Sequence, residues 1–571
     1  MPKIRQRTLS NPKACSVPNK SVPGPQAPSA PVDTFAHEQL PPRELWPVMT
    51  AIGIPDLDYP ASLNAAVELL DRNVQSGLGT HPCLRTDNEV WSYQKLLQCA
   101  NRIANLLVRR GLVPGERVLL RDINSPMLAA CWFAVLKAGG IAVATMSLIR
   151  AQELVAILTK ARIKYALCEK ELAQELVKAQ SSAPGLQEII LYENRHSAEI
   201  PPFLADYSAE FDNVITSQDD VALIAFSSGT TGEPKATVHF HRDLLAVCDT
   251  FSKHVLRPRA EDIFCGSPPL AFTFGLGGLL LFPMRAGAST LLLPKVTAES
   301  LLQAIERHRC TICFTAPTLY RSMIEFVQRF DLTSLKKCVS AGECLHVAVF
   351  EAWRKATGLK IIDGIGSTEM LHIFISAAGD EIRPGATGKP VPGYEAIVVD
   401  DAGRPLPTNT SGCLAIRGPT GCRYLNAPES QRKYVQNGWN ITGDSYRVDK
   451  DGYFWYEGRT DDLIVSAGYK ISPIEIETAL MGHPKVAECA VIGTPSEERG
   501  EIVKAFVILK DGTLADDLLR RELQDYVKSQ IAPYKYPRAI EFVAELPHTS
   551  TGKLQRSRLR KQERQKRQPT A

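Results

Sequence analysis

The amino-acid sequence predicts an α/β protein in which a large layered N-terminal domain precedes a small α+β C-terminal domain. The chain has 571 residues, too many for a single hydrophobic core, so at least two domains are expected. Up to about residue 360, helix–loop–strand units recur between prolines and glycines, which predicts sheets rich in parallel strands with helices packed on them. Between residues 473 and 543, a helix followed by mostly apolar strands indicates a second compact unit.

The first helix–loop–strand unit of the large domain is clearly marked. Apolar residues at positions 96, 97, 100, 103, 104 and 107 share one helical face. Gly111 then predicts the end of the helix, and residues 118–120 begin a strand. Residues 126–146 continue the pattern as a core helix and a strand, because Lys137 and a glycine pair interrupt an otherwise apolar run. No stretch is long enough to span a membrane.

Composition excludes several classes of function. The formal net charge of +4 is small for this length and gives no case for nucleic acid binding. The 14 cysteines follow no regular framework, which favours free thiols in a reducing compartment, and we expect a cytoplasmic protein. Cys310 and Cys313 are interpreted as buried thiols, because no second pair accompanies them.

Residues 1–32 are basic and rich in proline, which predicts a disordered leader, with an organellar transit peptide as the alternative.

The stretch 221–236 is the first local signal of function. Residues 221–226 form an apolar run typical of a buried strand. Residues that suit a phosphate chain follow: Ser227, Ser228, Gly229, Thr230, Thr231, Gly232 and, after a proline, Lys235. Glycines let backbone N–H groups turn inward, and hydroxyls with a lysine bind phosphate oxygens. The spacing differs from that of nucleoside triphosphatase loops, and an ordinary glycine–threonine turn is the alternative.

A second polar cluster follows the apolar strand predicted from residue 361. It comprises Asp363, Gly364, Gly366, Ser367, Thr368 and Glu369. On a turn supported by glycine, a hydroxyl beside a carboxylate can hold a phosphate oxygen and a Mg2+ ion respectively. Upstream, His239 and His241 flank an aromatic residue at a strand end, where a structural role is favoured over a catalytic one.

Further charged candidates lie in residues 438–480. Asp444 follows a Thr-Gly turn and could accept hydrogen bonds from both hydroxyls of a ribose, and Arg459 could donate to the ribose–phosphate region. Asp461 and Asp462 stand between two patterned regions, so we expect both to be exposed and to mark the domain boundary.

The chain ends in a lysine motif and a basic tail. Lys553 lies on a Thr-Gly turn, a position where a lysine is usually solvated, so its residue type alone indicates no catalytic role. The basic tail, residues 556–567, is expected to be a solvated, frayed end rather than a binding patch.

These motifs, in this order, resemble those of the adenylate-forming enzymes, which include acyl-CoA synthetases, amide-synthesising adenylation domains and luciferases. The resemblance covers roughly residues 90–560 through SSGTTGEPK, STE, TGD, GRTDD and PHTSTGKLQR. It implies ATP and CoA as cosubstrates and the following domains: a leader 1–32, an adenylation domain 33–459, a mobile lid domain 460–560 and a basic tail 561–571. It implies catalytic roles for Thr368, Glu369 and Lys553, with Glu369 placing Mg2+ and Lys553 bridging the acyl carboxylate and the α-phosphate.

The remaining implied roles concern nucleotide and thiol. The implied ATP-binding residues are Ser227, Ser228, Gly229, Thr230, Thr231, Gly232, Lys235, Asp363, Gly364, Gly366, Ser367, Thr368, Asp444, Arg459 and Lys553. Asp461 is implied as the hinge of the small domain, and Gly468 as part of the tunnel for the CoA thiol.

The variant GIGSTEMLHIF at residues 364–374 is similar to the benzoate and 2-aminobenzoate CoA ligases. It implies a small aromatic acid as substrate and an acyl pocket that includes Phe272, Gly366 and His372. Packing in the core is the alternative interpretation for both Phe272 and His372. The implied products are the acyl-CoA, AMP and pyrophosphate; no nucleic acid or membrane partner is expected, and a homodimer is left open.

Three departures from the family pattern keep other functions open. Ile365 replaces an aromatic residue, Val465 a common lysine and Ala236 a common glycine. The alternatives are an aryl adenylation enzyme that loads a separate carrier protein and a medium- or short-chain acyl-CoA synthetase. Two more are a luciferase-like oxygenase and a catalytically dead nucleotide-binding protein.

Overall fold

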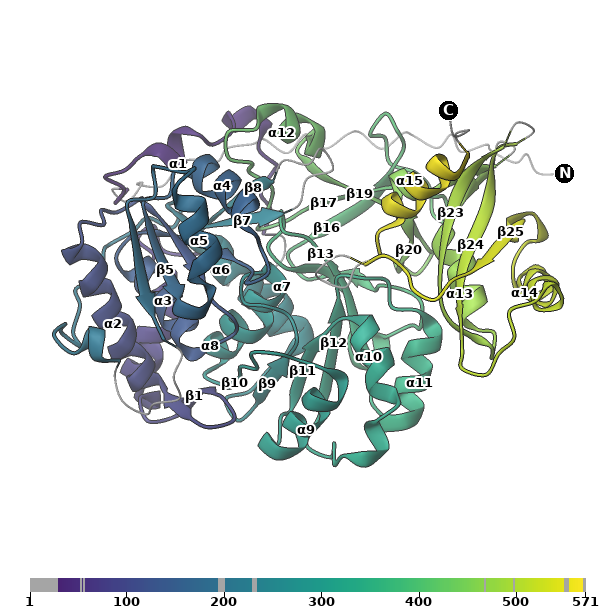
Figure 1. Cartoon of the computed structure of the whole chain (residues 1–571). Helices are drawn as coiled ribbons and strands as arrows, with labels where there is room; N and C mark the ends of the chain where they lie inside the picture. The colour runs from purple at the N-terminus through teal and green to yellow at the C-terminus, as the bar shows by residue number, and fades with distance from the viewer. Residues whose placement is uncertain are drawn as a thin grey trace, which may run out of the picture.

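The computed structural model describes residues 29–51, 54, 57–193, 201–227, 234–466, 469–496, 499–548 and 554–567. Within these residues, three sheets build a large N-terminal domain and a fourth builds a small C-terminal domain, which confirms the predicted fold class (Figure 1). The backbone of Ala30 donates to Asp220 at 3.0 Å, and that of Val32 donates to the Pro114 carbonyl at 2.8 Å. Residues 29–32 therefore contact the N-terminal domain, although we had assigned them to a disordered leader.

The first sheet of the N-terminal domain has six strands. Their order is β6 (Glu188–Tyr192), β5 (Tyr165–Glu169), β3 (Arg117–Arg121), β4 (Ile141–Thr145), β7 (Val221–Ser227) and β8 (Lys235–Phe240). All neighbours are parallel except β7 and β8, which pair antiparallel. Helices α2 (Tyr93–Arg109), α3 (Pro126–Lys137), α4 (Ala151–Lys160) and α5 (Ala173–Gln180) connect the earlier strands. The expected strand before the glycine–threonine segment is confirmed as β7.

Helix α2 shows how the sequence pattern produces an element. Ser92 caps its N-terminus by accepting from the backbone of Lys95 at 3.1 Å. Leu96, Ala100 and Ile103 are fully buried on one face, as the helical spacing predicted. The neighbouring helix α3 is buried along its whole length, including Lys137, whose ammonium group contacts Asp71 at 2.5 Å.

The second sheet has nine strands and carries the STE motif. Their order is β15 (Lys389–Pro390), β14 (Ile373–Ser376), β13 (Ile361–Gly366), β12 (Lys337–Ala341), β11 (Ile312–Thr315), β9 (Ile263–Gly266), β10 (Ser289–Leu291), β1 (Pro82–Arg85) and β2 (Val90–Ser92). The strands from β13 to β1 are parallel, and both edges are antiparallel. Helices α9 (Ala298–His308), α10 (Pro317–Ile324) and α11 (Val347–Thr357) pack on this sheet. Cys310 and Cys313 are fully buried there, as expected.

The third sheet is antiparallel and carries the TGD motif. It consists of β16 (Glu395–Val399), β17 (Gly412–Arg417), β18 (Val435–Gln436), β19 (Trp439–Val448) and β20 (Phe454–Arg459). We predicted a Thr-Gly turn before Asp444, and this is wrong, because the motif lies inside strand β19. Gly443 adopts φ of 74° within an irregular step in the pairing of β19 with β17, between the partners Ile441 and Ser445. The irregularity, rather than a chain reversal, gives Asp444 its place.

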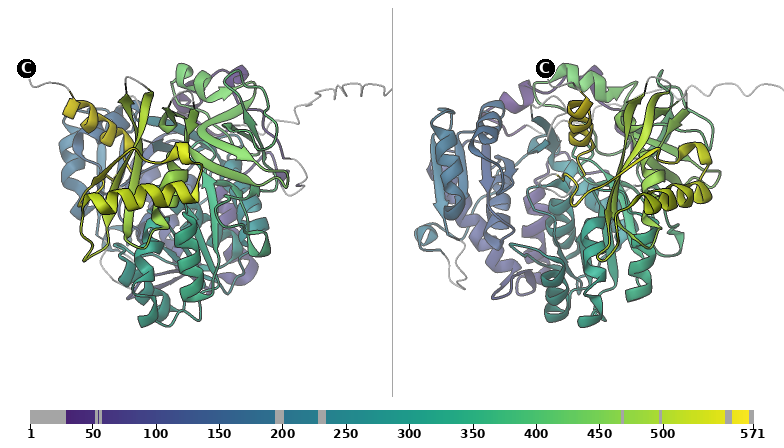
Figure 2. Two further views of the ribbon diagram at one scale, coloured as in Figure 1. Left: turned by 90° about the vertical axis from the view of Figure 1, so that its right-hand side faces the viewer. Right: turned by 45° about the vertical axis from the view of Figure 1, so that its right-hand side comes forward.

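The C-terminal domain has its own sheet and core. Strands β22 (Tyr469–Ile471), β21 (Ile464–Ser466), β24 (Gly500–Leu509) and β23 (Val486–Ser496) lie in this order, and β25 (Ala539–Phe542) pairs parallel with β24. Helices α13 (Pro473–Met481) and α14 (Asp517–Gln530) cover the core. Figure 2 shows this domain packed against one side of the N-terminal domain.

The basic tail differs from our expectation of a frayed end. Residues Arg556–Arg567 form helix α15, which packs on the C-terminal sheet through Leu559. The Arg556 side chain is only 12% exposed and binds the buried carboxylate of Glu477 at 2.6 Å. Burial and charge pairing therefore hold this segment, although its composition indicated a solvated end.

Candidate active site

The end of strand β7 and the turn after β13 meet at one tyrosine. Ser227, the last residue of β7, pairs in register with Lys235, the first residue of β8. The ammonium nitrogen of Lys235 lies 5.4 Å from the centre of the Tyr424 ring, and the Tyr424 hydroxyl donates to Glu369 Oε1 at 2.6 Å. Burial and the nearby Glu369 carboxylate raise the pKa of Tyr424, so its hydroxyl keeps its proton. Ser228, Gly229, Thr230, Thr231 and Gly232 lie outside the described residues.

A buried charge network supports the turn that carries Thr368 and Glu369. His239 Nε2 donates to the Thr368 carbonyl at 2.8 Å, and His239 Nδ1 lies 3.8 Å from Asp243. Asp243 in turn accepts from Arg423 at 2.8 Å, and these three side chains are fully buried. Burial alone would raise the pKa of Asp243, but Arg423 and His239 together lower it. The structural role expected for His239 is thus confirmed.

The glycines before this turn are needed for close packing. A Cβ at Gly364 would lie 2.7 Å from Ile373 Cγ2, and one at Gly366 would lie 2.7 Å from the His372 carbonyl oxygen. Strand β14 therefore approaches the backbone of β13 as closely as only glycine permits. Leu371, within the same turn, has φ of 70°, a conformation that is costly for a residue with a branched side chain. This local strain lies beside Glu369, where the packing of both strands maintains it.

Asp363 and Ser367 flank the glycines of β13. Burial raises the pKa of the Asp363 carboxyl well above its ordinary value. Its Oδ1 is buried and has no hydrogen-bond partner among the described residues. Ser367 Oγ accepts from the backbone of Met370 at 3.2 Å and lies 3.5 Å from the Tyr434 hydroxyl. Asp363 thus offers an acceptor that a donor group of a ligand would satisfy.

Asp444 and Arg459 are held together across strands β19 and β20. They are cross-strand partners, and Arg459 donates to Asp444 Oδ1 at 2.9 Å and to the Thr442 carbonyl at 3.1 Å. The pKa of Tyr434 is raised by burial first and then by the Glu369 and Asp444 carboxylates. Glu369 of the STE turn and Asp444 of the TGD strand therefore both act electrostatically on Tyr434, whose hydroxyl lies 3.5 Å from Ser367 Oγ.

An aromatic cage surrounds His372, next to the STE turn. The ring centres of Phe251, Phe274, Phe282 and Phe314 lie between 4.5 and 6.4 Å from the His372 ring. A Cβ at Gly277 would lie 2.3 Å from His372 Cδ2, so this glycine makes room for the ring. Burial lowers the pKa of His372 to about 3, against a smaller opposing effect of the Phe274 backbone. Neither ring nitrogen makes a hydrogen bond within the described part of the chain, so the ring is packed among aromatic side chains while its two nitrogens have no hydrogen-bond partner there.

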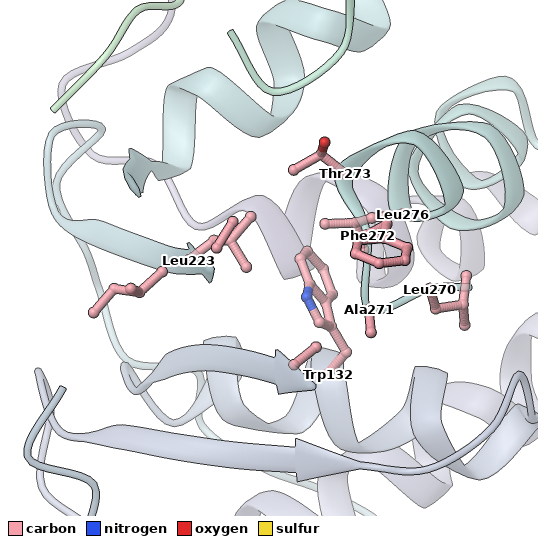
Figure 3. A pocket seen from close by; sticks show the side chains of 10 residues that line it. Trp132, Leu223, Leu270, Ala271, Phe272, Thr273 and Leu276 are labelled. Carbon is pink, nitrogen blue, oxygen red and sulfur yellow. The ribbon is translucent and has the colours of Figure 1, made fainter. Parts of the chain in front are cut away.

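Phe272 lines a pocket of its own beside this cage. Figure 3 shows Trp132 between Leu223 on one side and Phe272 and Leu276 on the other. Phe274, rather than Phe272, contacts His372 at a ring separation of 5.6 Å. The segment 268–278 thus places one phenylalanine, Phe272, at the pocket and the other, Phe274, in the cage, and the sequence alone could not divide these tasks.

The residues at the domain junction differ from each other in exposure. Asp461 is exposed in a short 3₁₀ turn, Thr460–Asp462, as expected for a charged residue between two patterned regions. We expected Asp462 to be exposed as well, but its side chain is only 11% exposed and contacts Arg560 at 2.5 Å and Arg556 at 3.7 Å. Gly468 and Lys553 lie outside the described residues.

Several supporting residues carry no signal in the sequence. Tyr424 and Arg423 are far in sequence from Glu369 and His239, and the cross-strand bridge of Tyr424 with Thr237 brings them together. A segment of the form RYLNAP has no periodicity or residue type that points to a site. The tertiary structure was needed to identify it.

Two family models match the chain. The model described as AMP-binding enzyme matches residues 70–424, and the model described as AMP-binding enzyme C-terminal domain matches residues 475–553. The benzoate–CoA ligase of Thauera aromatica is 36% identical over 513 residues, which are 89% of this chain and 97% of that protein. The human mitochondrial acyl-coenzyme A synthetase ACSM5 is 34% identical over 493 residues, 83% of this chain and 84% of that protein.

Solved structures give the same result. The anthranilate CoA ligase AuaEII in complex with anthranoyl-AMP superposes with a TM-score of 0.85 at 36% identity, covering 89% of this chain and 99% of that one. A benzoate CoA ligase from Burkholderia xenovorans LB400 superposes with a TM-score of 0.80 at 32% identity, covering 87% and 100%. The chain therefore belongs to the AMP-binding enzyme family and is an acid–thiol ligase similar to the benzoate and anthranilate CoA ligases.

Proposed function

We propose that this enzyme activates a small aromatic carboxylic acid with ATP and transfers the acyl group to CoA. In the first step, a carboxylate oxygen attacks the α-phosphorus of ATP, pyrophosphate leaves and an acyl-adenylate forms. In the second step, the sulfur of CoA attacks the acyl carbon, the bond from that carbon to the AMP oxygen breaks, and the thiol proton passes to solvent. The first step brings two anions together, the carboxylate and the triphosphate, so it requires fixed, oriented positive charge.

The nucleotide site is assigned to the residues that meet around Tyr424 and Tyr434. Ser227 and Lys235 would hold the β- and γ-phosphates together with the segment that follows β7. Thr368 would hold a phosphate oxygen, while Asp444 and Arg459 would bind the ribose and its phosphate. The fixed Asp444–Arg459 pair supports this assignment, because a carboxylate held in place by a neighbouring guanidinium is oriented to accept from hydroxyls.

Glu369 would hold Mg2+, and Lys553 would bridge the substrates. One Glu369 oxygen accepts from Tyr424, and the other has no partner among the described residues, which fits a carboxylate that holds a hard cation together with phosphate oxygens. When bound, Mg2+ would neutralise charge on the leaving pyrophosphate. Lys553, supplied by the C-terminal domain, would contact the acyl carboxylate and the α-phosphate. Asp461 would be the hinge, and Gly468 would line the path of the CoA thiol.

The aromatic surroundings of His372 carry the proposal of an aryl substrate. A flat ring packs favourably against the faces and edges of neighbouring rings. The neutral imidazole adds an unsatisfied polar group without adding charge, which suits a benzoate or a 2-aminobenzoate more than a long flexible chain. Phe272 and Gly366 complete the proposed acyl pocket. The similarity to the benzoate and anthranilate CoA ligases supports the same substrate class.

A pyrophosphate-release panel tests this function. Purified protein would be given ATP, Mg2+ and one acid at a time: benzoate, hydroxybenzoates, 2-aminobenzoate, and short and medium fatty acids. We expect release with one or more benzoates, and formation of the corresponding acyl-CoA when CoA is added. Release with fatty acids alone would instead support a medium- or short-chain acyl-CoA synthetase as the second candidate, and the similarity to a human mitochondrial acyl-coenzyme A synthetase is consistent with an acyl-CoA synthetase of that kind. Transfer to a carrier protein but not to CoA would contradict the proposed acceptor.

A further inference from the structure

A single carboxylate links the two domains beside the lysine segment. Arg321, on helix α10 of the N-terminal domain, places NH2 3.1 Å from Glu488 Oε2 on strand β23 of the C-terminal domain. The same guanidinium donates to the Ala487 carbonyl at 3.5 Å. The other oxygen of Glu488 lies 3.2 Å from His548 Nε2. Glu488 therefore contacts one basic side chain from each domain.

The hydrogen bonds of His548 define its part in this cluster. Its Nδ1 lies 2.9 Å from the Leu546 carbonyl oxygen, and its Nε2 faces the Glu488 carboxylate. Both partners are acceptors, so the ring can donate a hydrogen bond to either of them. Glu488 lies between the Arg321 guanidinium and the His548 ring, and the three side chains form a chain of polar contacts across the domain interface.

The cluster lies at the base of the segment that contains Lys553. His548 forms an isolated antiparallel bridge with Leu554, and the Gln555 backbone donates to the Pro547 carbonyl at 2.8 Å. The five residues between the bridged positions include Lys553. The contact of His548 with Glu488 therefore ties the start of this segment to the carboxylate that Arg321 holds.

On the far side of the segment, the contacts stay within the C-terminal domain. Arg556 donates to both oxygens of Glu477, at 2.6 and 2.8 Å. This pair travels with the domain in any rotation and cannot distinguish one orientation from another. The link from Arg321 to Glu488 crosses between domains, so a rotation would break it. Val465, beside the proposed thiol tunnel, is 48% exposed and therefore not covered by the N-terminal domain in the described orientation, whereas Glu488, the partner of His548, contacts Arg321 of that domain.

We propose that Arg321, Glu488 and His548 are positioning residues that favour the domain orientation in which Lys553 serves adenylate formation. This inference rests on the proposed function, because it assumes the role of Lys553 in the first step. The Arg321 and Glu488 side chains are 32% and 20% exposed, so their pairing is weak in absolute terms. A weak link is sufficient here. A contact that forms in only one of two interchanging orientations lowers the free energy of that orientation, and the ratio of the two populations changes by the corresponding factor.

The test measures the two half-reactions separately in Arg321→Met, Arg321→Lys, Glu488→Gln and the double variant Arg321→Met/Glu488→Gln. Adenylate formation is followed by acid-dependent exchange of pyrophosphate into ATP, and transfer by the reaction of preformed acyl-adenylate with CoA. We expect Arg321→Met to slow adenylate formation by about threefold, the range for a partly exposed charge pair, and to leave transfer unchanged or faster. Arg321→Lys should retain most of the rate. In the Glu488→Gln background, Arg321→Met should have no further effect, because the shared partner is already neutral.

Control variants separate this inference from the proposed function. Arg329, close by in the N-terminal domain, pairs with Glu299 at 3.5 Å within that domain, so Arg329→Met should change neither half-reaction. Lys553→Ala should slow adenylate formation by about a hundredfold or more and spare transfer. If Lys553→Ala spared adenylate formation, the role of Lys553 and the positioning role would both be wrong. If Lys553→Ala behaved as expected but Arg321→Met slowed both half-reactions equally or neither, only the positioning role would be overturned.

Discussion

Tyr424 belongs to none of the motifs, yet it contacts residues from two of them. Its hydroxyl binds Glu369 Oε1, and its ring lies beneath the ammonium group of Lys235. The neighbouring residue Arg423 forms the buried pair with Asp243, on which His239 and the Thr368 carbonyl depend. At the scale of single residues, then, the motif side chains take their positions from partners that the motifs do not include.

The variant Tyr424→Phe removes one hydroxyl and retains the ring. Glu369 would lose its short hydrogen bond, and the carboxylate would be free to rotate. We expect the Mg2+ concentration that gives half-maximal adenylate formation to rise several-fold, while the free energy of unfolding falls by about 1 kcal/mol, the usual contribution of one hydrogen bond. A Mg2+ titration of pyrophosphate release checks this. An unchanged titration curve would show that Tyr424 does not position Glu369.

Two buried histidines predict how stability depends on pH. Burial lowers the pKa of His241 to about 4 and that of His372 to about 3, and both side chains are almost completely inaccessible. In the unfolded chain these groups titrate near pH 6.5. Between the two values the unfolded state binds more protons, so stability is fully present above pH 6.5 and falls as the pH decreases towards 4. Each histidine contributes a slope of up to about 1.4 kcal/mol per pH unit.

Urea unfolding between pH 7 and pH 5 measures this slope. The free energy of unfolding should fall steadily, and His372→Phe or His241→Asn should each reduce the slope, whatever the variant does to stability at pH 7. A slope that both variants leave unchanged would mean that other groups determine the acid sensitivity, such as His346, whose pKa burial also lowers to about 4.

At the scale of elements, the β13–β14 pair sets the shape of the site. The close approach of these strands at Gly366 leaves no room for a methyl group. We expect Gly366→Ala to cost about 1–3 kcal/mol of stability by overpacking and to displace the turn that carries Glu369, slowing adenylate formation at least tenfold. Gly185→Ala is the matched control, because its added Cβ would meet nothing within 4 Å. Equal activity of the two variants would contradict the packing argument.

The same element shows which parts of the site the sequence could predict. Strand β13 and its polar end were predictable, because an apolar run, glycines and hydroxyls follow each other directly in the chain. The place of Asp444 was not, because an irregularity inside β19 has no local signature that separates it from a turn. The tail helix α15 was also missed, since a charged composition hides the one buried face formed by Arg556 and Leu559. Local sequence patterns predict helices and strands. Which polar residues are buried depends on charged partners far away in the sequence, and local patterns do not reveal these partners.

At the scale of the whole molecule, the proposed reaction uses residues of both domains. The junction is marked by Asp461, which is exposed, and by Asp462, which is tied to helix α15 through Arg560 and Arg556. Contacts between the domains include polar ones, such as His346 with Thr478 at 3.1 Å and Arg321 with Glu488 at 3.1 Å. An interface of this kind allows the rotation that the proposed second step requires.

The variant Asp461→Pro tests whether rotation at this position is needed. Proline fixes φ near −65° and removes conformational freedom from the proposed hinge. We expect adenylate formation to be largely retained and thioester formation from preformed acyl-adenylate to fall at least tenfold. Thermal unfolding of the variant is the control, and equal loss of both half-reactions would indicate a folding defect rather than a blocked hinge.

The central claim is that the acid is activated as an adenylate, and isotope transfer tests it most directly. Benzoate, or the best acid of the panel, would be labelled with oxygen-18 in its carboxylate and incubated with ATP, Mg2+, CoA and the enzyme, and the released nucleotide analysed by mass spectrometry. Attack of a carboxylate oxygen on the α-phosphorus predicts AMP that carries one labelled oxygen. Unlabelled AMP, or ADP formed together with labelled phosphate, would contradict the account.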